Sequence, residues 1–342
     1  MWPGSRVLVT GGASFIGSHL SEELIRRGAS VRIVDDLSSG SRANIAAVQD
    51  RLEFIDGNLL DPNHASKAME DIDVVFHLAA FHGGRGYIDA HPADCSMNMV
   101  LDGIVFDAAR RADVDTVCYA SSACVYPTLL QNDGSGTLLR EDMANLSAPG
   151  GALADREYGW AKLMGEMSLR AFHQQYGLNG SVCRLFTVYG ERENETHAIP
   201  ALIAKAFVRL DPYEVWGSGN QDRNFTYVGD VVRGMVLAAE RIRDAAPVNI
   251  GASEHVRIRD VVRLIFELTG FRPRDVHYDL SKPVGVTSRA ADLTRTQKLL
   301  GWQPEVSFSE GLRRTIDWYY STHDADSVRS TLPTLLTERS AR

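Results

Sequence analysis

The sequence predicts an α/β protein with a doubly wound parallel sheet and a smaller C-terminal lobe. Short apolar runs rich in β-branched residues alternate with longer segments of helical period, a glycine-rich turn follows the first run, and the alternation becomes irregular after residue 187. Alternating strands and helices of this kind are typical of βαβ units, whose parallel sheet is buried on both faces.

Six runs have the pattern of buried strands: 6–10, 30–35, 52–56, 74–78, 116–120 and 181–185. Three segments space their apolar residues so that one helical face meets the sheet: 16–27, 92–111 and 157–176. Residues 131–151 are rich in Gly, Ser, Asn and Asp. We therefore expect a surface loop there, near the carboxyl edge of the sheet.

The later elements are shorter and of mixed type, with a strand predicted at 214–216 and helices at 260–269 and 294–300. We expect a first domain at 1–187, to which 226–250 returns, and a smaller lobe made of 188–225 and 251–321. The polar tail at 322–342 is expected to be loosely held.

The composition excludes several classes of partner. The 342 residues include 36 Lys and Arg against 44 Asp and Glu, a formal net charge of −8, which gives no attraction for nucleic acid or anionic lipid. No stretch reaches membrane-spanning length and no apolar leader precedes the first strand. We expect a cytoplasmic protein without a metal site, because its cysteines (Cys95, Cys118, Cys124 and Cys183) lack zinc spacing.

The turn after the first strand, TGGASFIG, predicts a dinucleotide site of the Rossmann type. There the phosphates would meet backbone N–H groups at a helix N-terminus, with Phe15 and Ile16 beside them. Gly11 can make the turn, and Gly17 lets the helix pack on the strand. Ser14 stands where a glycine usually approaches the pyrophosphate, and we expect it to be tolerated.

The end of the second strand favours NAD over NADP. Asp35 lies about twenty residues past the glycines, where a carboxylate accepts hydrogen bonds from the adenosine ribose and repels a 2′-phosphate. No arginine follows immediately to receive such a phosphate. Five residues at the ends of the next strands are also expected beside the cofactor: Asn58, Leu59, Leu78, Ala79 and Ala80.

A tyrosine and a lysine four residues apart are candidates for redox chemistry. Tyr158 and Lys162 share one face of the helix predicted at 157–176 and would also contact the cofactor. A nearby ammonium and the positive nicotinamide favour the phenolate, so Tyr158 can take a hydroxyl proton near neutral pH while hydride moves to NAD. Ser122, at a strand end, is expected to hydrogen-bond the same substrate oxygen.

The chain resembles the extended short-chain dehydrogenase/reductases that modify nucleoside diphosphate sugars, over nearly its whole length. The motifs that carry the resemblance are TGGASFIG, HLAA, YASSACVYP, YGWAK, RLFTVYG, WGSGNQDRNFTYVGD and SRAADLTRTQKLLGWQP. It implies that 1–187 binds NAD, that the smaller lobe binds the nucleotide sugar, and that the predicted helices 92–111 and 157–176 form a homodimer.

Three substrate-binding positions follow from the same resemblance. Arg223 and Arg289 would hold the diphosphate, for which the planar guanidinium is suited because it donates two hydrogen bonds at once. Thr187 stands where the family usually carries an asparagine that positions the substrate. That departure leaves the sugar contacts at this position open.

The residues after Ser122 indicate which reaction the resemblance implies. The 4,6-dehydratases carry an Asp-Glu pair where this chain has Ala123 and Cys124, which disfavours dehydration. The segment SSACVYP is instead similar to GDP-mannose 3,5-epimerases and GDP-fucose synthases, which use a cysteine there to move protons on carbon. The segment FHGGRGY resembles the substrate loop of the former, and implies sugar contacts at Gly83, Gly84 and Arg85.

Epimerisation beside a ketone requires two bases. His197 lies where the synthases carry a histidine and the epimerases a lysine, so it is the implied partner of Cys124. A histidine titrates near working pH, and a thiol near the cofactor's positive charge is partly ionised. The expected reaction oxidises C4 of GDP-mannose or a related GDP-hexose, inverts C3, C5 or both through an enolate, and reduces C4 again.

Three alternatives stay open. A 4-epimerase acting on a substrate like UDP-glucose would oxidise C4 and reduce it from the other face, with Cys124 as a bystander. An NADPH-dependent 3,5-epimerase/reductase would start from a 4-keto sugar, against which Asp35 argues. A silent NAD-sensing protein would keep the fold alone, which Tyr158, Lys162 and Ser122 disfavour. The sequence specifies neither the nucleotide base, nor the sugar configuration, nor the inverted carbon.

Overall fold

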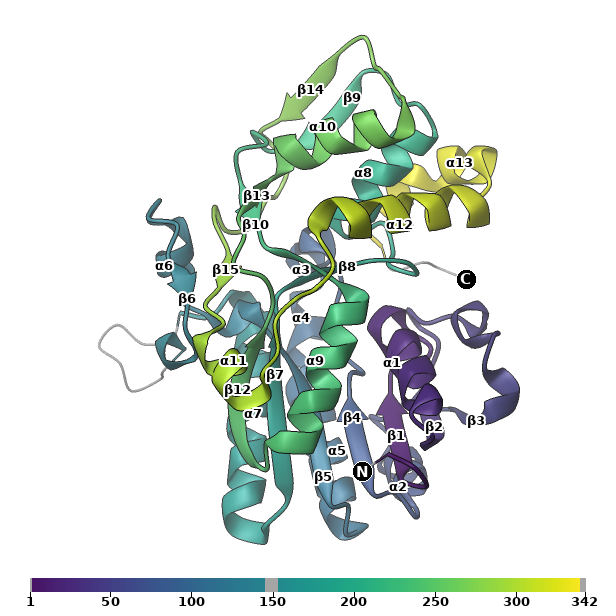
Figure 1. The fold of residues 1–342 in the computed structure, drawn as a ribbon, viewed down its shortest axis with the longest axis vertical. Coiled ribbons are helices and arrows are strands. Elements are labelled where there is room, and N and C mark those ends of the chain that lie inside the picture. The colour runs from purple at the N-terminus through teal and green to yellow at the C-terminus, as the bar shows by residue number, and fades with distance from the viewer. Residues whose placement is uncertain (1, 145–152, 339–342) are drawn as a thin grey trace.

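The centre of the structure, a computed structural model that describes residues 2–144 and 153–338, is a parallel sheet of seven strands (Figure 1). The strands are β1 (Arg6–Thr10), β2 (Ser30–Asp35), β3 (Leu52–Asp56), β4 (Val74–His77), β5 (Thr116–Ser122), β7 (Asn179–Leu185) and β12 (Asp244–Ile250). Their order is β12-β7-β5-β4-β1-β2-β3. The order reverses between β4 and β1, and in such sheets ligands bind beyond the carboxyl ends at that point.

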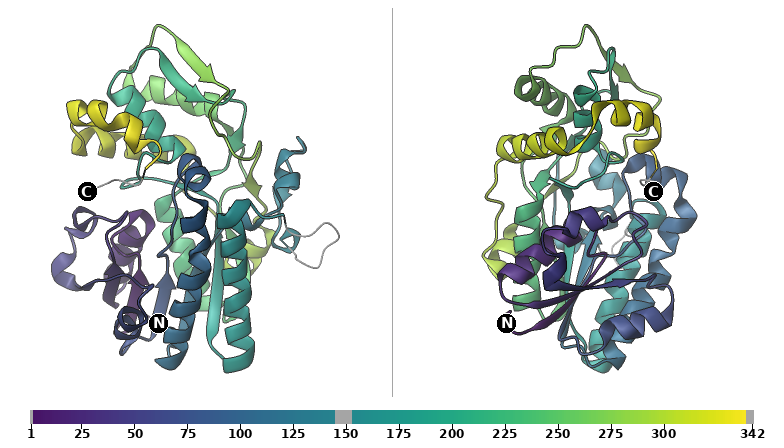
Figure 2. Two further views of the ribbon diagram at one scale, coloured as in Figure 1. Left: turned by 180° about the vertical axis from the view of Figure 1, so that it is seen from behind. Right: turned by 90° about the vertical axis from the view of Figure 1, so that its right-hand side faces the viewer.

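The predicted α/β class is confirmed, because helices cover both faces of the sheet (Figure 2). Val7 and Val9 of β1 face one core, shared with α1 (Phe15–Arg26) and α9 (Val228–Arg241), whereas Leu8 faces the other. The second core is shared with α2 (Pro62–Met69), α5 (Asn98–Arg111) and α7 (Arg156–Tyr176). Successive strand residues point to opposite faces, which explains the continuous apolar run of a strand buried on both sides.

The smaller lobe stands beyond the carboxyl ends of the strands (Figure 1). Its helices are α8 (Ala198–Phe207), α10 (Ile258–Thr269), α12 (Phe308–Thr322) and α13 (Ala325–Leu335). Its strands are β8 (Thr187–Tyr189), β9 (Tyr213–Trp216), β10 (Asp222–Arg223), β11 (Phe225–Tyr227), β13 (Val256–Arg257) and β14 (Val276–Asp279). Ile203, Ile265 and Leu312 are fully buried in a core of its own.

The predicted helix at 92–111 is divided at Met97 into α4 (Pro92–Ser96) and α5. The Asn98 side chain accounts for the break, because its amide donates to the carbonyl oxygens of Cys95 at 2.9 Å and Phe81 at 3.0 Å. A side chain that captures nearby backbone groups in this way competes with the helical hydrogen-bond ladder.

Part of the segment expected to be a loop, 131–151, forms regular elements. It contains the end of α6 (Thr128–Asn132), strand β6 (Leu138–Leu139) and a 3₁₀ turn at Glu141–Met143, whereas 145–152 lie outside the described residues. β6 pairs with β15 (Ala290–Ala291). The expected loop is therefore wrong for these elements, which a distant segment of the chain stabilises.

Two further expectations are corrected in the C-terminal part. The tail expected to be loose forms α13, because Asp324 caps the helix and Val328 and Leu332, four residues apart, are buried in the core of the lobe. Helix α11 (Thr294–Leu300), assigned to the smaller lobe, packs against α9 and β12, and the adjoining Trp302 is fully buried there.

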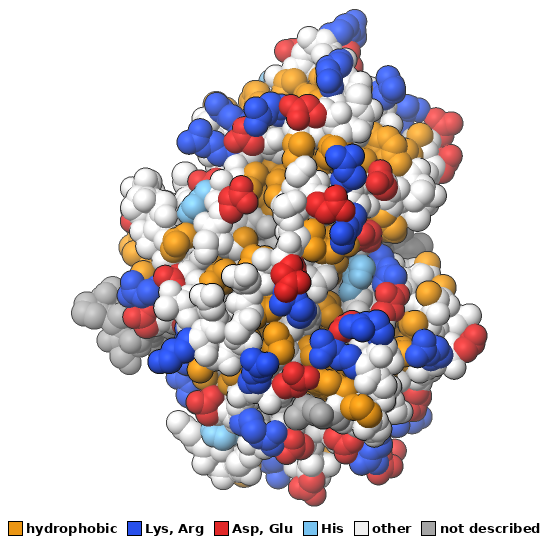
Figure 3. Space-filling view, in the orientation of Figure 1, with side chains coloured by type: hydrophobic (Ala, Val, Ile, Leu, Met, Phe, Trp, Pro, Cys, Tyr) orange, Lys and Arg blue, Asp and Glu red, His pale blue; other side chains and the backbone are white. Residues whose placement is uncertain are grey.

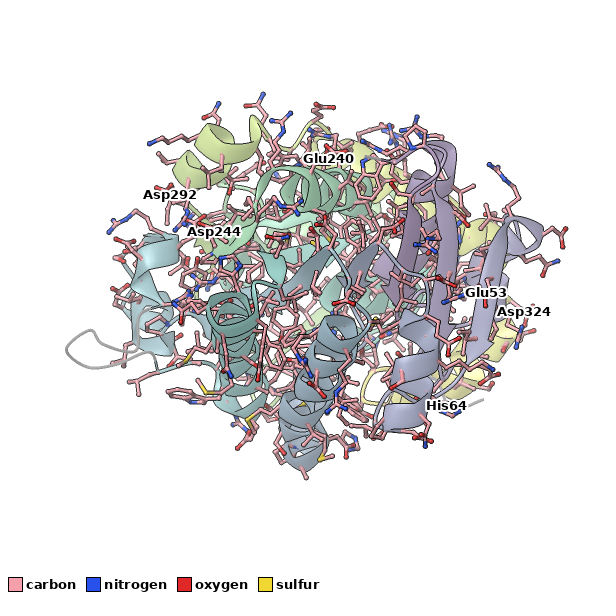
Figure 4. The ribbon with its side chains drawn as sticks, turned by 90° about the horizontal axis from the view of Figure 1, so that it is seen from below. Glu53, His64, Glu240, Asp244, Asp292 and Asp324 are labelled. Atoms are coloured by element: carbon pink, nitrogen blue, oxygen red, sulfur yellow. The ribbon has the colours of Figure 1, made fainter. Side chains whose placement is uncertain are left out.

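The surface carries charges of both signs. On the face shown in Figure 3, positive and negative side chains are interspersed. Seen from below, Glu240 of α9 and Glu53 of β3 lie at the periphery, outside the buried layers (Figure 4). Within the described residues, no helix is both long and apolar enough to cross a bilayer.

Candidate active site

Two adjoining cavities lie at the carboxyl ends of the strands. The larger, of about 410 Å³, is bordered by Tyr158 from the sheet domain and by Arg223 and Val215 from the lobe. The smaller, of about 80 Å³, contains the predicted Gly11, Asp35, Asn58, Leu59 and Ala79 in its lining. Ser14, Ser39, Leu78 and Ala80 line both cavities. An elongated ligand can therefore extend from one into the other.

The glycine-rich turn fits a dinucleotide phosphate. Gly11 has a φ of +67°, a conformation that favours glycine. Gly17 lines neither cavity, but a Cβ there would collide with the Gly11 carbonyl oxygen. Ser14 has a φ of −82° and its hydroxyl donates to the same carbonyl at 2.5 Å, so its side chain introduces no backbone strain. Helix α1 begins at Phe15, which presents N-terminal amides to an anion.

Asp35 is held in place by the backbone around it. Its Oδ2 accepts from the Ala13 amide at 2.9 Å and its Oδ1 from the Leu37 amide at 2.8 Å. Asn58 donates to Asp36 at 3.2 Å, which joins the ends of β2 and β3. These residues fit the adenosine half of NAD, because a fixed carboxylate lines the smaller cavity.

Tyr158 and Lys162 lie buried on α7, with exposed fractions of 5% and 2%. Burial raises the pKa of Tyr158 well above its ordinary value, with a contribution from the nearby Cys124 and Cys95, while a hydrogen bond with Ser122 lowers it. Burial also lowers the pKa of Lys162, against the influence of Asp102 and Glu166. The expected shift towards phenolate is thus outweighed by desolvation in the protein itself.

Cys124 packs beside Tyr158. Both belong to one buried cluster with Tyr87, and the Cys124 sulfur accepts from Arg289 Nη1 at 3.4 Å. The Cys124 carbonyl accepts from the Asp155 amide at 2.8 Å, directly before α7 begins. The thiol and the Tyr-Lys helix are therefore joined through the backbone.

His197 lies on the opposite, lobe-side wall, at the N-cap of α8. Its ring centroid is 5.1 Å from that of His82, which is in turn 4.9 Å from that of Tyr158. Gly84 brings the two loops together, since its amide donates to Thr196 Oγ1 at 3.1 Å and a Cβ there would collide with the Thr196 carbonyl.

Three arginines gather at the far side of the larger cavity. Arg85 donates to both carboxylate oxygens of Asp155, at 2.9 and 3.1 Å, and Arg289 lies 3.4 Å from one of them. Burial works to raise the pKa of Asp155, but Arg289 and Arg85 lower it below its usual value. Burial and the neighbouring Arg289 lower the pKa of Arg223 to about 10. Such a cluster can bind a diphosphate bidentately.

The structure brings the other predicted site residues to the same cavities. The larger one is lined by Phe15, Ile16, Gly83, Ser122 and Thr187. Three residues that were not predicted also line it: His82, Asp155 and Glu193. The available signals were their spacing: His82 directly precedes the Gly83-Gly84 pair, Asp155 stands three residues before Tyr158, and Glu193 stands four before His197.

Comparison with known proteins identifies relatives of the whole chain. A sequence model described as the NAD dependent epimerase/dehydratase family matches residues 7–251. A putative UDP-glucose 4-epimerase from Methanocaldococcus jannaschii is 30% identical over 91% of this chain and 97% of its own length. GDP-mannose 3,5-epimerase from Arabidopsis thaliana is 29% identical over 93% of this chain and 83% of its own.

Solved structures agree with this result. The UDP-glucose 4-epimerase of Thermus thermophilus, solved in complex with NAD, has a TM-score of 0.82 and 25% identity, and the match covers 93% of this chain and all of that one. The relatives thus include enzymes named for inversion at C4 and enzymes named for inversion at C3 and C5. Similarity alone does not choose between these reactions.

Proposed function

Because the chain belongs to the NAD-dependent epimerase/dehydratase family, we propose that it inverts C3, C5 or both in a nucleoside diphosphate hexose, through a transient ketone at C4. The observation that supports this most directly is the Cys124 thiol beside Tyr158, with the His197 imidazole in the same cavity. A GDP-hexose such as GDP-mannose is the proposed substrate, in keeping with the Arabidopsis relative.

Tyr158 is the proposed base for the C4 hydroxyl. When bound along Gly11, Ser14 and Asp35, NAD supplies the acceptor for the C4 hydrogen and a positive ring that favours the Tyr158 phenolate. Tyr158 takes the hydroxyl proton and later returns it, while Ser122 hydrogen-bonds the same oxygen. The buried Lys162 ammonium stabilises the phenolate from the next turn of α7.

Cys124 and His197 are the proposed pair that moves protons on carbon. A C4 ketone acidifies the hydrogens on C3 and C5, so the Cys124 thiolate takes one as a proton and leaves an enolate. The His197 imidazole returns a proton to the opposite face, which forms the inverted C–H bond. The Arg289 guanidinium donates to the Cys124 sulfur at 3.4 Å and so lies beside the proposed proton acceptor.

The diphosphate is proposed to lie against Arg85, Arg223 and Arg289. An added Cβ on Gly285 would lie 3.2 Å from Arg85 Cδ and 3.7 Å from Arg223 Nη2, so these two guanidinium arms approach the same loop. Asp155 stabilises Arg85 and Arg289 by ion pairs. A nucleotide held there would present its sugar to Tyr158.

A homodimer through α5 and α7 is part of the proposal. These helices pack against one another and lie side by side at the back of the molecule (Figure 2, left). Four large apolar side chains on them are more than one-third exposed: Met99, Val100, Trp160 and Met167. An apolar surface of this kind is typical of a contact between subunits.

Inversion at C4 alone is the second candidate, favoured by the names of the Methanocaldococcus and Thermus relatives. It needs Tyr158 and the cofactor but no proton exchange on carbon. The two reactions therefore differ in what happens to the C3 and C5 hydrogens.

Heavy water separates the candidates. We expect the wild-type protein with NAD and GDP-mannose to incorporate deuterium at C3 or C5, detected by NMR and mass spectrometry. C124S should lose this incorporation by about 100-fold or more, because one acid-base group is removed, yet still oxidise C4 as followed by reduced-nicotinamide absorbance. Turnover without label in the wild type would contradict the proposal, and a C4-inverted product would then identify the second candidate.

A further inference from the structure

The Glu193 carboxyl is buried at the wall of the larger cavity. Its side chain is 3% exposed, and its Oε1 lies 3.5 Å from the Nδ1 atom of His197. Its Oε2 has no hydrogen-bond partner among the described residues. A buried polar atom without a hydrogen-bond partner lowers the free energy of unfolding. Such an atom at the wall of a cavity therefore points to a role in the site.

The surroundings favour the neutral acid. Burial and the neighbouring Glu195 raise the pKa of Glu193 well above its usual range, against a hydrogen bond from the Gly190 backbone. Glu195 is engaged elsewhere, since it accepts from the Tyr319 hydroxyl at 2.6 Å and lies 3.9 Å from His323. Arg192 points to Ser18 and Glu22 at 3.1 and 2.6 Å. His197 is thus the titratable group placed to exchange a proton with Glu193.

His197 also lines the larger cavity, next to His82. The rings of His197, His82 and Tyr158 follow one another at 5.1 and 4.9 Å between centroids. Together with Glu193 they form a line from a buried carboxyl to the proposed C4 base. The two nitrogens of a histidine are distinct, and the partner of one determines the protonation of the other.

We propose that Glu193 is the positioning residue of His197, sharing a proton with Nδ1 so that Nε2 serves the sugar carbon. The inference rests on the proposed 3,5-epimerisation. As Nε2 gives its proton to the enolate carbon, Nδ1 takes the proton of the Glu193 acid, and His197 remains neutral while Glu193 becomes a carboxylate. Solvent water then reprotonates Glu193 and accepts the proton held by Cys124, which restores the starting state.

E193Q tests this role, because the amide keeps the volume of the acid but does not relay its proton. In heavy water with NAD and GDP-mannose, we expect C3 or C5 labelling to fall by about 100-fold. C4 oxidation, followed by reduced-nicotinamide absorbance, should remain near the wild-type rate. The pH profile of labelling should lose the limb set by loss of the Glu193 proton, a change that a merely structural role would not produce.

Three controls make the result interpretable. E141Q neutralises another buried acid, which binds the Asn249 amide at 2.9 Å outside the cavity, and should label normally. E193D keeps the acid, withdraws it by one methylene, and should recover part of the lost rate. The E193Q/H197N double variant should label no more slowly than H197N, because the two residues act as one unit.

Two outcomes would overturn the inference, and they are distinguishable. If wild-type protein labels C3 or C5 and E193Q labels equally fast with an unchanged pH profile, the Glu193 role is wrong while the proposed function stands. If the wild type turns over without label, both are wrong. Should E193Q fail to fold in a thermal-unfolding assay, E193D tests the same role, because its shorter acid is drawn away from Nδ1: it should label more slowly than the wild type, and labelling at the wild-type rate would overturn the inference.

Discussion

Arg223 differs from the other arginines of the site in what its guanidinium contacts. Its hydrogen bonds go to the backbone carbonyls of Asp222 and Val284, at 2.6 and 2.8 Å, whereas Arg85 and Arg289 share the Asp155 carboxylate. Asp222 and Asp155 act on Arg223 through their charge, but within the described residues no carboxylate makes an ion pair with it, and a partly buried charge of this kind becomes more favourable once an anion arrives. Arg223 is therefore placed to meet the diphosphate.

R223M should bind the nucleotide sugar more weakly than the wild type, but its ligand-free form should be more stable. We expect nucleotide-sugar binding, measured by calorimetry, to weaken about 10- to 100-fold, since a hydrogen bond to a charged group contributes about 1.5–3 kcal/mol. The ligand-free variant should melt at a higher temperature, because burial already lowers the pKa of this guanidinium to about 10. R263M, on an exposed part of α10, is the control that should change neither. Unaltered affinity in R223M would rule out the diphosphate contact.

Residue spacing predicted part of the candidate site but not all of the residues that line it. Tyr158, Lys162 and Cys124 could be predicted, because each stands in a local motif at a strand end or on one helical face. Glu193 could have been found from its spacing, four residues before His197, whereas the place of His82 beside His197 depends on the contact between Gly84 and Thr196, which are 112 positions apart. No local pattern contains such a contact.

At the scale of elements, β4 connects the sheet to the helices through His77. Its Nδ1 lies 2.8 Å from Thr10 Oγ1 on β1, and its Nε2 lies 3.0 Å from Asp102 Oδ1 on α5. The Tyr119 hydroxyl of β5 donates to the same carboxylate at 2.5 Å. Four elements thus meet in one buried polar network beneath the site. Such a network stabilises the fold only while each of its polar groups keeps its hydrogen-bond partner.

This network should make the fold sensitive to acid. Burial lowers the pKa of His77 below 6.5, against the influence of Asp102, so the unfolded chain binds a proton that the folded chain does not. The contribution of His77 to the free energy of unfolding is fully present above pH 6.5. As the pH falls below 6.5, this contribution decreases by at most about 1.4 kcal/mol per pH unit.

Urea titrations from about pH 7.5 to about pH 5 measure this slope. H77Q, which does not titrate, should be less stable than the wild type at the upper end, and the difference should shrink on acidification. A constant difference across the range would contradict the prediction.

Element type was predictable wherever the apolar period was strong. Strands β1, β2 and β3 have the predicted bounds, whereas β4 ends one residue before the predicted end, and β5 extends two residues beyond its own. Helix α13 was missed because polar residues surround its two core contacts, Val328 and Leu332. Strand β6 has two residues, so only pairing with β15 defines it.

At the scale of the molecule, α7 has one surface that lines the cavity and another that is exposed to solvent. One carries Tyr158 and Lys162 into the cavity, and the other exposes Trp160 and Met167 beside α5. A subunit contact on the outer surface would stabilise the helix that carries the proposed base. In the proposed dimer, assembly would therefore bear on catalysis as well as on size.

The assembly can be tested with charges on that surface. We expect the wild type to have twice the chain mass of 37.7 kDa by light scattering after size-exclusion chromatography. The M99E/M167E variant should have the single-chain mass, because two carboxylates per subunit would be desolvated in the contact. L280E, on a side chain 74% exposed in the lobe, should leave the mass unchanged. A wild-type protein of single-chain mass would contradict the dimer.

The link between Cys124 and α7 has a consequence for redesigning the enzyme. The contacts that join them are made by the Cys124 carbonyl, which accepts from Asp155 and lies where a side chain on Gly159 would collide. This backbone hydrogen bond does not depend on which side chain stands at position 124. A search for new sugar isomers can therefore vary residue 124 first, while Tyr158 and Lys162, proposed for the oxidation of C4, are kept.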